Sequence, residues 1–226
     1  AVADGGLRLV ADTTTLPRGE GAEWTFRIVG PDGATVTDFE VGHEREMHLI
    51  LVRRDLSGYQ HLHPRRGPDG AWRVGLRLPE AGAYRAYADF ARGGRAYTLA
   101  TDLFVAGAFA PQPPPAPAPV DTTGDYRAAL SAEGVAPGRS AGLAYDLTRE
   151  GRPLVDVEPY LGADGHLVAL REGDLAFLHV HPEESDAPGR IRFAAELPSA
   201  GRYRLFLQFR HDGAVRTVAH TLEVPS

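Results

Sequence analysis

Residues 38–64 read DFEVGHEREMHLILVRRDLSGYQHLHP, and residues 156–182 read DVEPYLGADGHLVALREGDLAFLHVHP. The two stretches align without a gap and repeat a histidine triplet: His48, His61 and His63 become His166, His179 and His181. A second pair follows in the same order, LPEAGAYRAYADF at 78–90 and LPSAGRYRLFLQF at 197–209. Two matched blocks in one order indicate an internal duplication in which each copy is a folding unit.

A run of proline and alanine, PQPPPAPAP at 111–119, separates the two copies. This composition favours extended polyproline II and therefore a semi-rigid spacer. We expect domain 1 at residues 1–110, a linker at 111–118 and domain 2 at 119–226.

Short alternating segments separated by turn residues fill each copy. Those of domain 1 lie at 6–11, 23–30, 37–41, 47–54, 59–63, 72–78, 84–90 and 96–105. Turn signals such as Pro31-Asp32-Gly33 separate them, and no stretch combines helical periodicity with capping residues. About seven strands in roughly 105 residues are typical of an immunoglobulin-like sandwich. The sequence therefore predicts an all-β protein of two tandem immunoglobulin-like β-sandwich domains.

Composition excludes several classes of protein. The net charge of −6 argues against a nucleic-acid partner, because phosphate binding requires clustered positive charge. No apolar run approaches the roughly 20 residues of a membrane helix, so no transmembrane segment is predicted. The chain has no cysteine, which excludes disulfides and thiolate metal sites. It starts AVADGG, which we interpret as a mature start after signal-peptide removal, hence a secreted, periplasmic or cell-surface location.

The spacing of the triplet has a direct structural meaning. On a strand, His61 and His63 point to the same face, because side chains alternate. If residues 55–58 form a hairpin loop, Ile50 on the preceding strand faces His63. His48 then shares that face and lies diagonal to His63, close enough for long side chains to meet. Three imidazoles are therefore expected to converge in each copy.

Three neutral imidazoles are a donor set that suits Zn(II), Cu(II) or Ni(II). We therefore predict a copper or zinc site in each copy, with all six repeated histidines as ligands: His48, His61, His63, His166, His179 and His181. A fourth ligand or a supporting partner is expected from Glu40 or Glu158, or from Asp89 or its counterpart Gln208. A bound water is a further candidate for the fourth position.

A structural reading of the same histidines stays open, since H-x-H on a strand also occurs without a metal. Met47 precedes His48 but points to the opposite face, so soft copper ligation has little support. His43, His211 and His220 have no counterpart in the other copy, and we expect them on the surface, with His43 near the domain 1 cluster.

The segment EPYLGADGHLVALREGDLAFLHVHP, followed by AGRYRLFLQF, resembles a segment of secreted or membrane-anchored bacterial proteins associated with heavy-metal handling. The resemblance covers about residues 156–210, and it touches His166, His179, His181 and Gln208. It is weaker in domain 1, where Met47 replaces Gly165 and Asp89 replaces Gln208. It implies a part in copper or other heavy-metal homeostasis.

Three functions are compatible with these patterns. The first is an extracytoplasmic copper- or zinc-binding protein in metal homeostasis or delivery, with the metal ion and a protein that receives it as partners. The alternative is a non-catalytic adhesion or scaffold module whose histidines are structural. The second alternative, a zinc-dependent hydrolase, is least favoured, because the chain has no nucleophile elbow, HExxH helix or phosphate loop.

Overall fold

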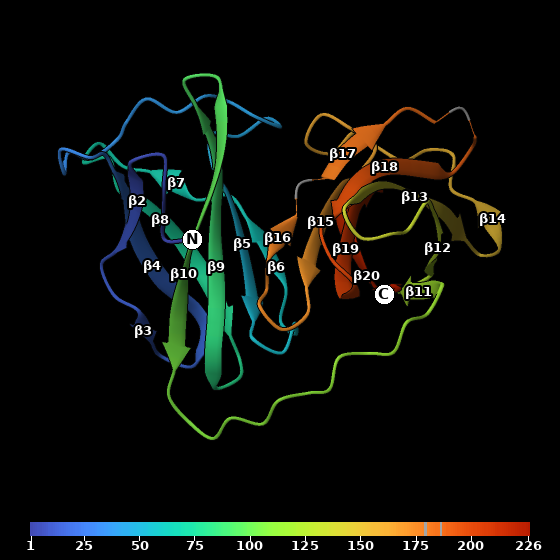
Figure 1. Cartoon of the computed structure of the whole chain (residues 1–226), viewed down its shortest axis with the longest axis horizontal. Coiled ribbons are helices and arrows are strands. Elements are labelled where there is room, and N and C mark those ends of the chain that lie inside the picture. The colour runs from blue at the N-terminus through green and yellow to red at the C-terminus, as the bar shows by residue number, and fades with distance from the viewer. Residues whose placement is uncertain (179, 186) are drawn as a thin grey trace. The chain divides into compact units, whose positions relative to one another are not determined.

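The computed structural model describes residues 1–178, 180–185 and 187–226. These residues form twenty β-strands and no helix (Figure 1). The chain divides into two compact units, Ala1–Pro114 and Pro115–Ser226. No helix of the described residues is long and apolar enough to cross a bilayer.

Domain 1 consists of two antiparallel sheets, with one short parallel strand added to the second. The first sheet has the order β1-β2-β4-β8-β7 and the second the order β3-β10-β9-β5-β6. The strands are β1 (Ala3–Asp4), β2 (Leu7–Ala11), β3 (Thr15–Leu16), β4 (Gly19–Val29), β5 (His48–Arg53), β6 (Gln60–Leu62), β7 (Arg65–Arg66), β8 (Trp72–Leu78), β9 (Gly82–Arg92) and β10 (Arg95–Val105).

Domain 2 repeats this arrangement with the sheets β11-β12-β13-β18-β17 and β16-β15-β19-β20, and β14 pairs with β13. Its strands are β11 (Val120–Thr123), β12 (Tyr126–Glu133), β13 (Arg139–Arg149), β14 (Arg152–Pro153), β15 (His166–Arg171), β16 (Phe177–Leu178), β17 (Val180–Glu183), β18 (Arg190–Leu197), β19 (Gly201–His211) and β20 (Ala214–Val224). Apart from β3, which has no counterpart in domain 2, and the added β14, the strand order is the same. This confirms two tandem immunoglobulin-like β-sandwiches that arose by duplication.

Alternation of side chains builds the core of each sandwich. On β4, Trp24, Phe26 and Ile28 point inward and are fully buried. Leu49 and Leu51 of β5 meet them from the opposite sheet, in the same cluster. His48 has the other parity, so its side chain leaves β5 on the face away from this core.

A tyrosine at the start of β9 is repeated at the start of β19. Tyr84 donates its hydroxyl to the carbonyl of Glu80 at 2.8 Å, and Tyr203 donates to the carbonyl of Ser199 at 2.8 Å. A tyrosine that bonds back to the backbone at this corner is a feature of immunoglobulin-like folds. It explains physically why the LP-x-AG-x-YR block recurs in the sequence.

One predicted strand is wrong. Residues 37–41 make only an isolated bridge, Glu40 to Ala91, and no strand, because no neighbouring strand is available to pair along their length. Residues 106–118 carry no regular structure, and their first part is fixed to domain 1. Ala110 accepts a hydrogen bond from Arg53 at 3.1 Å, and the amide of Gln112 donates to Asp55 at 2.9 Å.

Candidate metal centre

The hairpin of β5 and β6 carries the histidine triplet of domain 1. Its register pairs Leu49 with Leu62 and Ile50 with His61. The predicted register, with Ile50 opposite His63, is therefore wrong by two residues, because the loop spans 54–59 and is longer than expected. A shift of two residues leaves every side chain on its original face, since the strand period is two. Continued by one residue, the observed register places His63 directly opposite His48.

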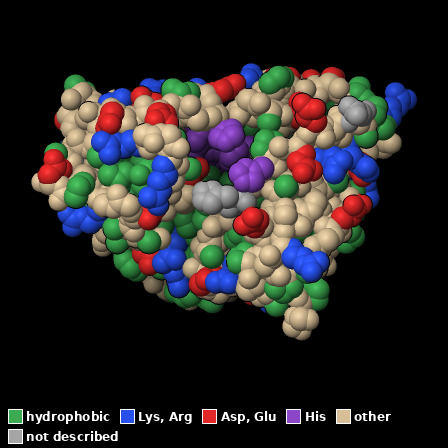
Figure 2. All heavy atoms as spheres, turned by 45° about the horizontal axis from the view of Figure 1, so that its top comes forward, with side chains coloured by type: hydrophobic (Ala, Val, Ile, Leu, Met, Phe, Trp, Pro, Cys, Tyr) green, Lys and Arg blue, Asp and Glu red, His purple; other side chains and the backbone are tan. Residues whose placement is uncertain are grey.

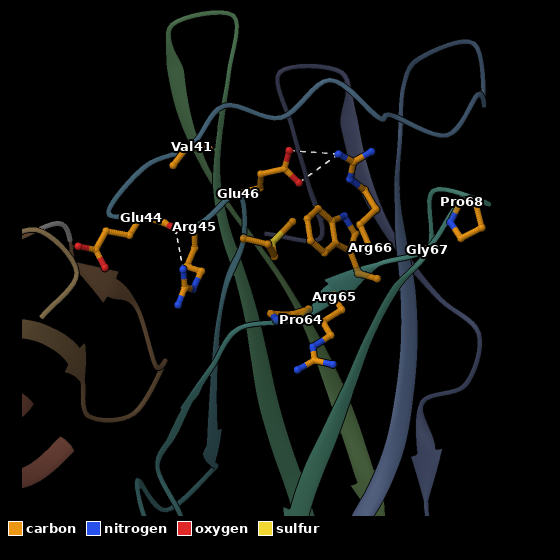
Figure 3. Close-up of a pocket in the computed structure, with 11 residues that line it drawn as sticks. Val41, Glu44, Arg45, Glu46, Pro64, Arg65, Arg66, Gly67 and Pro68 are labelled. Atoms are coloured by element: carbon orange, nitrogen blue, oxygen red, sulfur yellow. Dashed lines mark hydrogen bonds and ion pairs between the residues drawn. The ribbon is translucent and has the colours of Figure 1, made fainter. Parts of the chain in front are cut away.

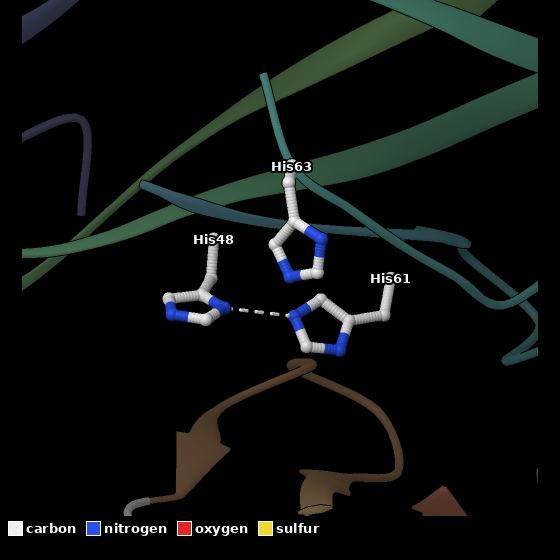
Figure 4. Close-up of side chains that lie close together, drawn as sticks. All are labelled: His48, His61 and His63. Atoms are coloured by element: carbon white, nitrogen blue, oxygen red, sulfur yellow. Dashed lines mark hydrogen bonds between the residues drawn. The ribbon is translucent and has the colours of Figure 1, made fainter. Parts of the chain in front are cut away.

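The three imidazoles of domain 1 converge as predicted (Figure 4). Nδ1 of His48 lies 3.1 Å from Nε2 of His61. The ring centroids are 5.3 Å apart for His48 and His61, 5.1 Å for His48 and His63, and 4.9 Å for His61 and His63. One nitrogen from each ring lies within 4.8 Å of the other two.

These ring separations lie nearer to the spacing of tetrahedral than of square-planar coordination. With metal–nitrogen bonds of about 2.05 Å and an angle of 109°, neighbouring imidazole centroids lie about 5.2 Å apart. A square-planar angle of 90° would bring them to about 4.5 Å. The donor nitrogens themselves would be about 3.3 Å apart. His48 and His61 already meet this separation, and the donor nitrogen of His63 lies within 4.8 Å of both.

A backbone carbonyl orients the buried His48. Its Nε2 lies 2.9 Å from the carbonyl oxygen of Gly42, which can only accept a hydrogen bond. Nε2 therefore carries the proton, and the lone pair is on Nδ1, which faces His61. Metal-binding histidines are commonly held in this way through their second nitrogen. Nδ1 of His48 therefore accepts a hydrogen bond from Nε2 of His61, and the same lone pair is the one that would bind a metal ion.

His63 contributes a buried nitrogen with an unused lone pair or proton. Its Nε2 has no hydrogen-bond partner among the described residues (Figure 4). Burial, reinforced by the nearby His48 and Arg45, lowers the pKa of His63 to about 4. Burial also lowers the pKa of His48, against the opposing effect of the Gly42 carbonyl. Both imidazoles are therefore neutral at pH 7, which is the state that binds a cation.

The lowered pKa of His63 predicts acid sensitivity of domain 1. Between pH 6.5 and about 4 the unfolded chain binds a proton at this position that the folded chain does not, so stability falls as the pH falls. After allowance for partial solvent access, we expect a loss on the order of 2 kcal/mol in the unfolding free energy between pH 7 and pH 4.

Urea unfolding of the metal-free chain, followed by tryptophan fluorescence, tests this expectation, because both tryptophans, Trp24 and Trp72, lie in domain 1. The variant His63→Gln cannot titrate there and should lose stability less steeply. Identical pH profiles for the two proteins would contradict the prediction.

Of the other predicted site residues, Asp89 and Gln208 lie beside the first histidine of each triplet, whereas Glu40 and Glu158 bind backbone amides. Asp89 lies opposite His48 on β9 and accepts a hydrogen bond from Thr98 at 2.7 Å. Its counterpart Gln208 lies opposite His166 in the same relation. Glu40 and Glu158 instead accept backbone amides of the following hairpin turns, from Gly94 at 2.9 Å and Gly213 at 2.7 Å.

The triplet of domain 2 is described only in part. His166 is half-buried on β15, and His181 is exposed on β17, which pairs with β18 in the other sheet. His179 lies outside the described residues. Metal ligation by His166, His179 and His181 therefore stays a prediction.

Two of the three unrepeated histidines are not surface residues. His211 and His220 are 4% and 1% exposed. Nδ1 of His211 lies 2.9 Å from the Tyr126 hydroxyl, and its Nε2 lies 3.1 Å from Asp156. His220 lies 3.3 Å from the carbonyl of Ala128 through Nε2. The partners of His211 offset the cost of burying its ring, whereas His220 has a partner at Nε2 but none at its buried Nδ1 among the described residues.

His43, in contrast, is exposed as expected. Its ring centroid is 6.2 Å from that of His48. Its proximity to the triplet is as expected, whereas the contact of the Gly42 carbonyl with His48 does not follow from the triplet spacing, because Gly42 precedes the strand.

A pocket of about 550 Å³ lies beside the loop that precedes β5 (Figure 3). Its wall includes Met47, Trp72, Arg45 and Arg65, and Glu46 pairs with Arg66 through both carboxylate oxygens at 3.1 Å. The arginines would repel a cation, so the histidine group is the better metal centre. On the face seen in Figure 2, basic and acidic side chains are interspersed and form no large patch of one charge. Histidine side chains reach the surface on the same face.

Comparisons with known proteins identify a family without a known activity. The sequence matches the family described as "Domain of unknown function (DUF8832)" twice, over residues 1–107 and 120–226. No curated protein matches it. The copper-handling resemblance therefore stays an expectation.

Solved structures with a similar fold are distant. A DUF4426 family protein from Pseudomonas aeruginosa PAO1 is 10% identical, with 47% of this chain and 93% of that chain covered and a TM-score of 0.35. The Escherichia coli adhesin FdeC is 14% identical, over 100% of this chain and 66% of its own, with a TM-score of 0.33. The integrin-binding protein invasin is 12% identical, over 96% and 39%, with a TM-score of 0.27. The chain thus spans only part of the length of FdeC and invasin, and such distant matches carry no information on ligands or partners.

Proposed function

The chain belongs to the DUF8832 family and carries its domain twice, and from this premise we propose that it is an extracytoplasmic metal-binding protein. Domain 1 binds one Zn(II) or copper ion through His48, His61 and His63. The protein serves metal homeostasis or delivery, with a protein that receives the ion as its partner. The extracytoplasmic location rests on the resemblance to secreted bacterial proteins.

One observation carries the proposal: three imidazole nitrogens, from β5, from β6 and from the residue directly after β6, lie within 4.8 Å of one another. Neutral imidazoles gain little from one another when they are brought this close, so their convergence needs another explanation. Only the His48–His61 contact is a hydrogen bond within the triplet. A metal ion would satisfy all three nitrogens, including the buried Nε2 of His63.

The chemistry of the ligands agrees with this assignment. Metal binding to histidine competes with protonation, so lowered pKa values favour occupancy in mildly acidic surroundings. His48 and His63 have lowered pKa values, and the Gly42 carbonyl fixes the donor atom of His48. The main competing function is an adhesion or scaffold module in which the histidines only close the sandwich.

Metal content after equilibrium dialysis separates these functions. The wild-type chain is dialysed against Zn(II) and, separately, Cu(II), and bound metal per chain is measured. We expect at least one equivalent, and His61→Ala should lose one. Gln60→Ala is the matched control, because this neighbour on β6 points to the opposite face and bonds the backbone of Arg77.

A direct competition between the two metals then names the ion. If neither metal binds stoichiometrically to the wild-type chain, the proposal falls, and the scaffold function replaces it. If domain 2 also binds, the wild-type chain holds a second equivalent that His166→Ala removes.

A further inference from the structure

The pocket of domain 1 shown in Figure 3 combines an apolar wall with positive charge. Its volume of about 550 Å³ lies within the range of small-molecule sites. The wall includes Met47, Pro64 and Trp72, and the charge comes from Arg45, Arg65 and Arg66. We propose that this pocket binds a small organic acid, whose carboxylate lies on the arginines and whose apolar or aromatic body packs on the wall. This inference needs no bound metal and goes beyond the proposed function.

Two of the three arginines have no acidic partner. Arg66 is neutralised by Glu46, whose two carboxylate oxygens each lie 3.1 Å from its Nη2. Arg45 donates to the backbone carbonyl of Glu44 at 2.9 Å, and neither it nor Arg65 forms an ion pair with a described residue. The carboxylate of Glu44 points away from the other labelled side chains in Figure 3. The pocket therefore offers two guanidinium groups, each of which can bind a carboxylate through paired N–H donors.

Two further donors at this pocket are buried without a partner among the described residues. They are Nε1 of Trp72 and Nε of Arg66. Trp72 is only 2% exposed, and the guanidinium carbon of Arg66 lies 5.6 Å from the centroid of its ring. A buried N–H group that makes no hydrogen bond costs free energy, and an acceptor oxygen in the pocket would offset that cost.

The two halves of the pocket together select the class of ligand. An inorganic anion would use the arginines but would gain nothing from the faces of Met47 and Trp72. A neutral apolar molecule would use these faces but would leave the guanidinium groups and the indole N–H without an acceptor. An organic acid satisfies both halves.

Domain 2 has a hollow at the equivalent place without these groups. It has a volume of about 350 Å³ and lies between the segments that precede β15 and β18, as the first pocket lies between those that precede β5 and β8. Ile191 lines it where domain 1 has Trp72, so no indole donor is present. The residues aligned with the three arginines are Ala163, Glu183 and Glu184. The positive charge is therefore specific to domain 1, and only domain 1 is expected to bind an acid.

The probe for this site is phenylacetate, titrated into the metal-free, isotope-labelled full-length chain at pH 7. The chain has two tryptophans, so a nitrogen–proton correlation spectrum holds two indole signals, which Trp72→Phe assigns. We expect the Trp72 signal to shift and saturate, with a Kd on the order of 1 mM for a probe of this size. The Trp24 signal should stay in place, because this indole donates to the carbonyl of Thr13 at 3.0 Å.

Three variants locate the binding site. Arg65→Glu introduces the charge of domain 2 at an exposed residue and should weaken phenylacetate binding by at least about tenfold. Arg54→Glu makes the same change of charge at an exposed residue outside the pocket, and it should bind like wild type. His61→Ala should also bind like wild type, since the histidine group is not part of this site.

Two related probes test the ligand class. Phenylacetamide keeps the ring without the charge, and acetate keeps the charge without the ring, so both should bind much more weakly than phenylacetate. Binding of either as tight as that of phenylacetate would overturn the class. An unmoved Trp72 signal, or equal affinities for Arg65→Glu and wild type, would overturn the site. Loss of binding in His61→Ala would place the probe at the histidines and would also overturn it. None of these results bears on metal binding, which the dialysis experiment tests separately.

Discussion

Zinc at a thousand times its dissociation constant is expected to raise the unfolding free energy of domain 1 by about 4 kcal/mol, and His48→Gln should abolish this gain. An ion that binds only the folded chain stabilises it by mass action. Glutamine keeps a donor near the Gly42 carbonyl and fills most of the volume of the buried ring, but its amide does not replace the Nδ1 lone pair.

Urea unfolding with and without Zn(II), followed by the fluorescence of the two tryptophans of domain 1, measures this effect. His166→Gln is the matched control in domain 2, and it should leave the zinc-dependent shift of the fluorescence transition unchanged. A shift of the same size in His48→Gln would remove His48 from the site.

Asp55→Ala is expected to destabilise domain 1 by about 3–5 kcal/mol, because it leaves a buried guanidinium without its counter-ion. The Arg53 side chain is 2% exposed, and Asp55 is 5% exposed and pairs with it at 3.0 Å. Arg53 also donates to the carbonyls of Ala81 and Ala110 at 3.1 Å. Asp55 accepts the amide of Gln112 at 2.9 Å, so the same change also releases the start of the linker.

Fluorescence-detected unfolding again reports on domain 1 alone. Glu20→Ala is the control, because its ion pair with Arg77 is well exposed, at 63% and 71%, and exposed pairs contribute less than about 1 kcal/mol. A loss for Asp55→Ala no larger than that of Glu20→Ala would show that the Arg53–Asp55 pair does not anchor the loop and linker.

The repeated block near the tyrosine corner shows what the local sequence could predict and what it could not. The pattern LP-x-AG-x-YR identified the duplication, but the role of Tyr84 and Tyr203 became clear only from their hydrogen bonds to Glu80 and Ser199. A hydroxyl partner four residues upstream depends on the shape of the corner, which no periodicity encodes. The burial of His211 and His220 was missed for a related reason, since their polar partners Tyr126, Asp156 and Ala128 come from distant segments.

By itself, the sequence determined the duplication, the two β-sandwiches and the common face of His48, His61 and His63. These follow from matched blocks and from the alternation of side chains, which is a local property of a strand and survives a register shift of two residues. Tertiary structure alone decided the actual register, the contact between His48 and His61, and the left-handed turn that brings the Gly42 carbonyl to His48. Loop closure and packing between sheets set these features, and they depend on contacts between residues far apart in the chain.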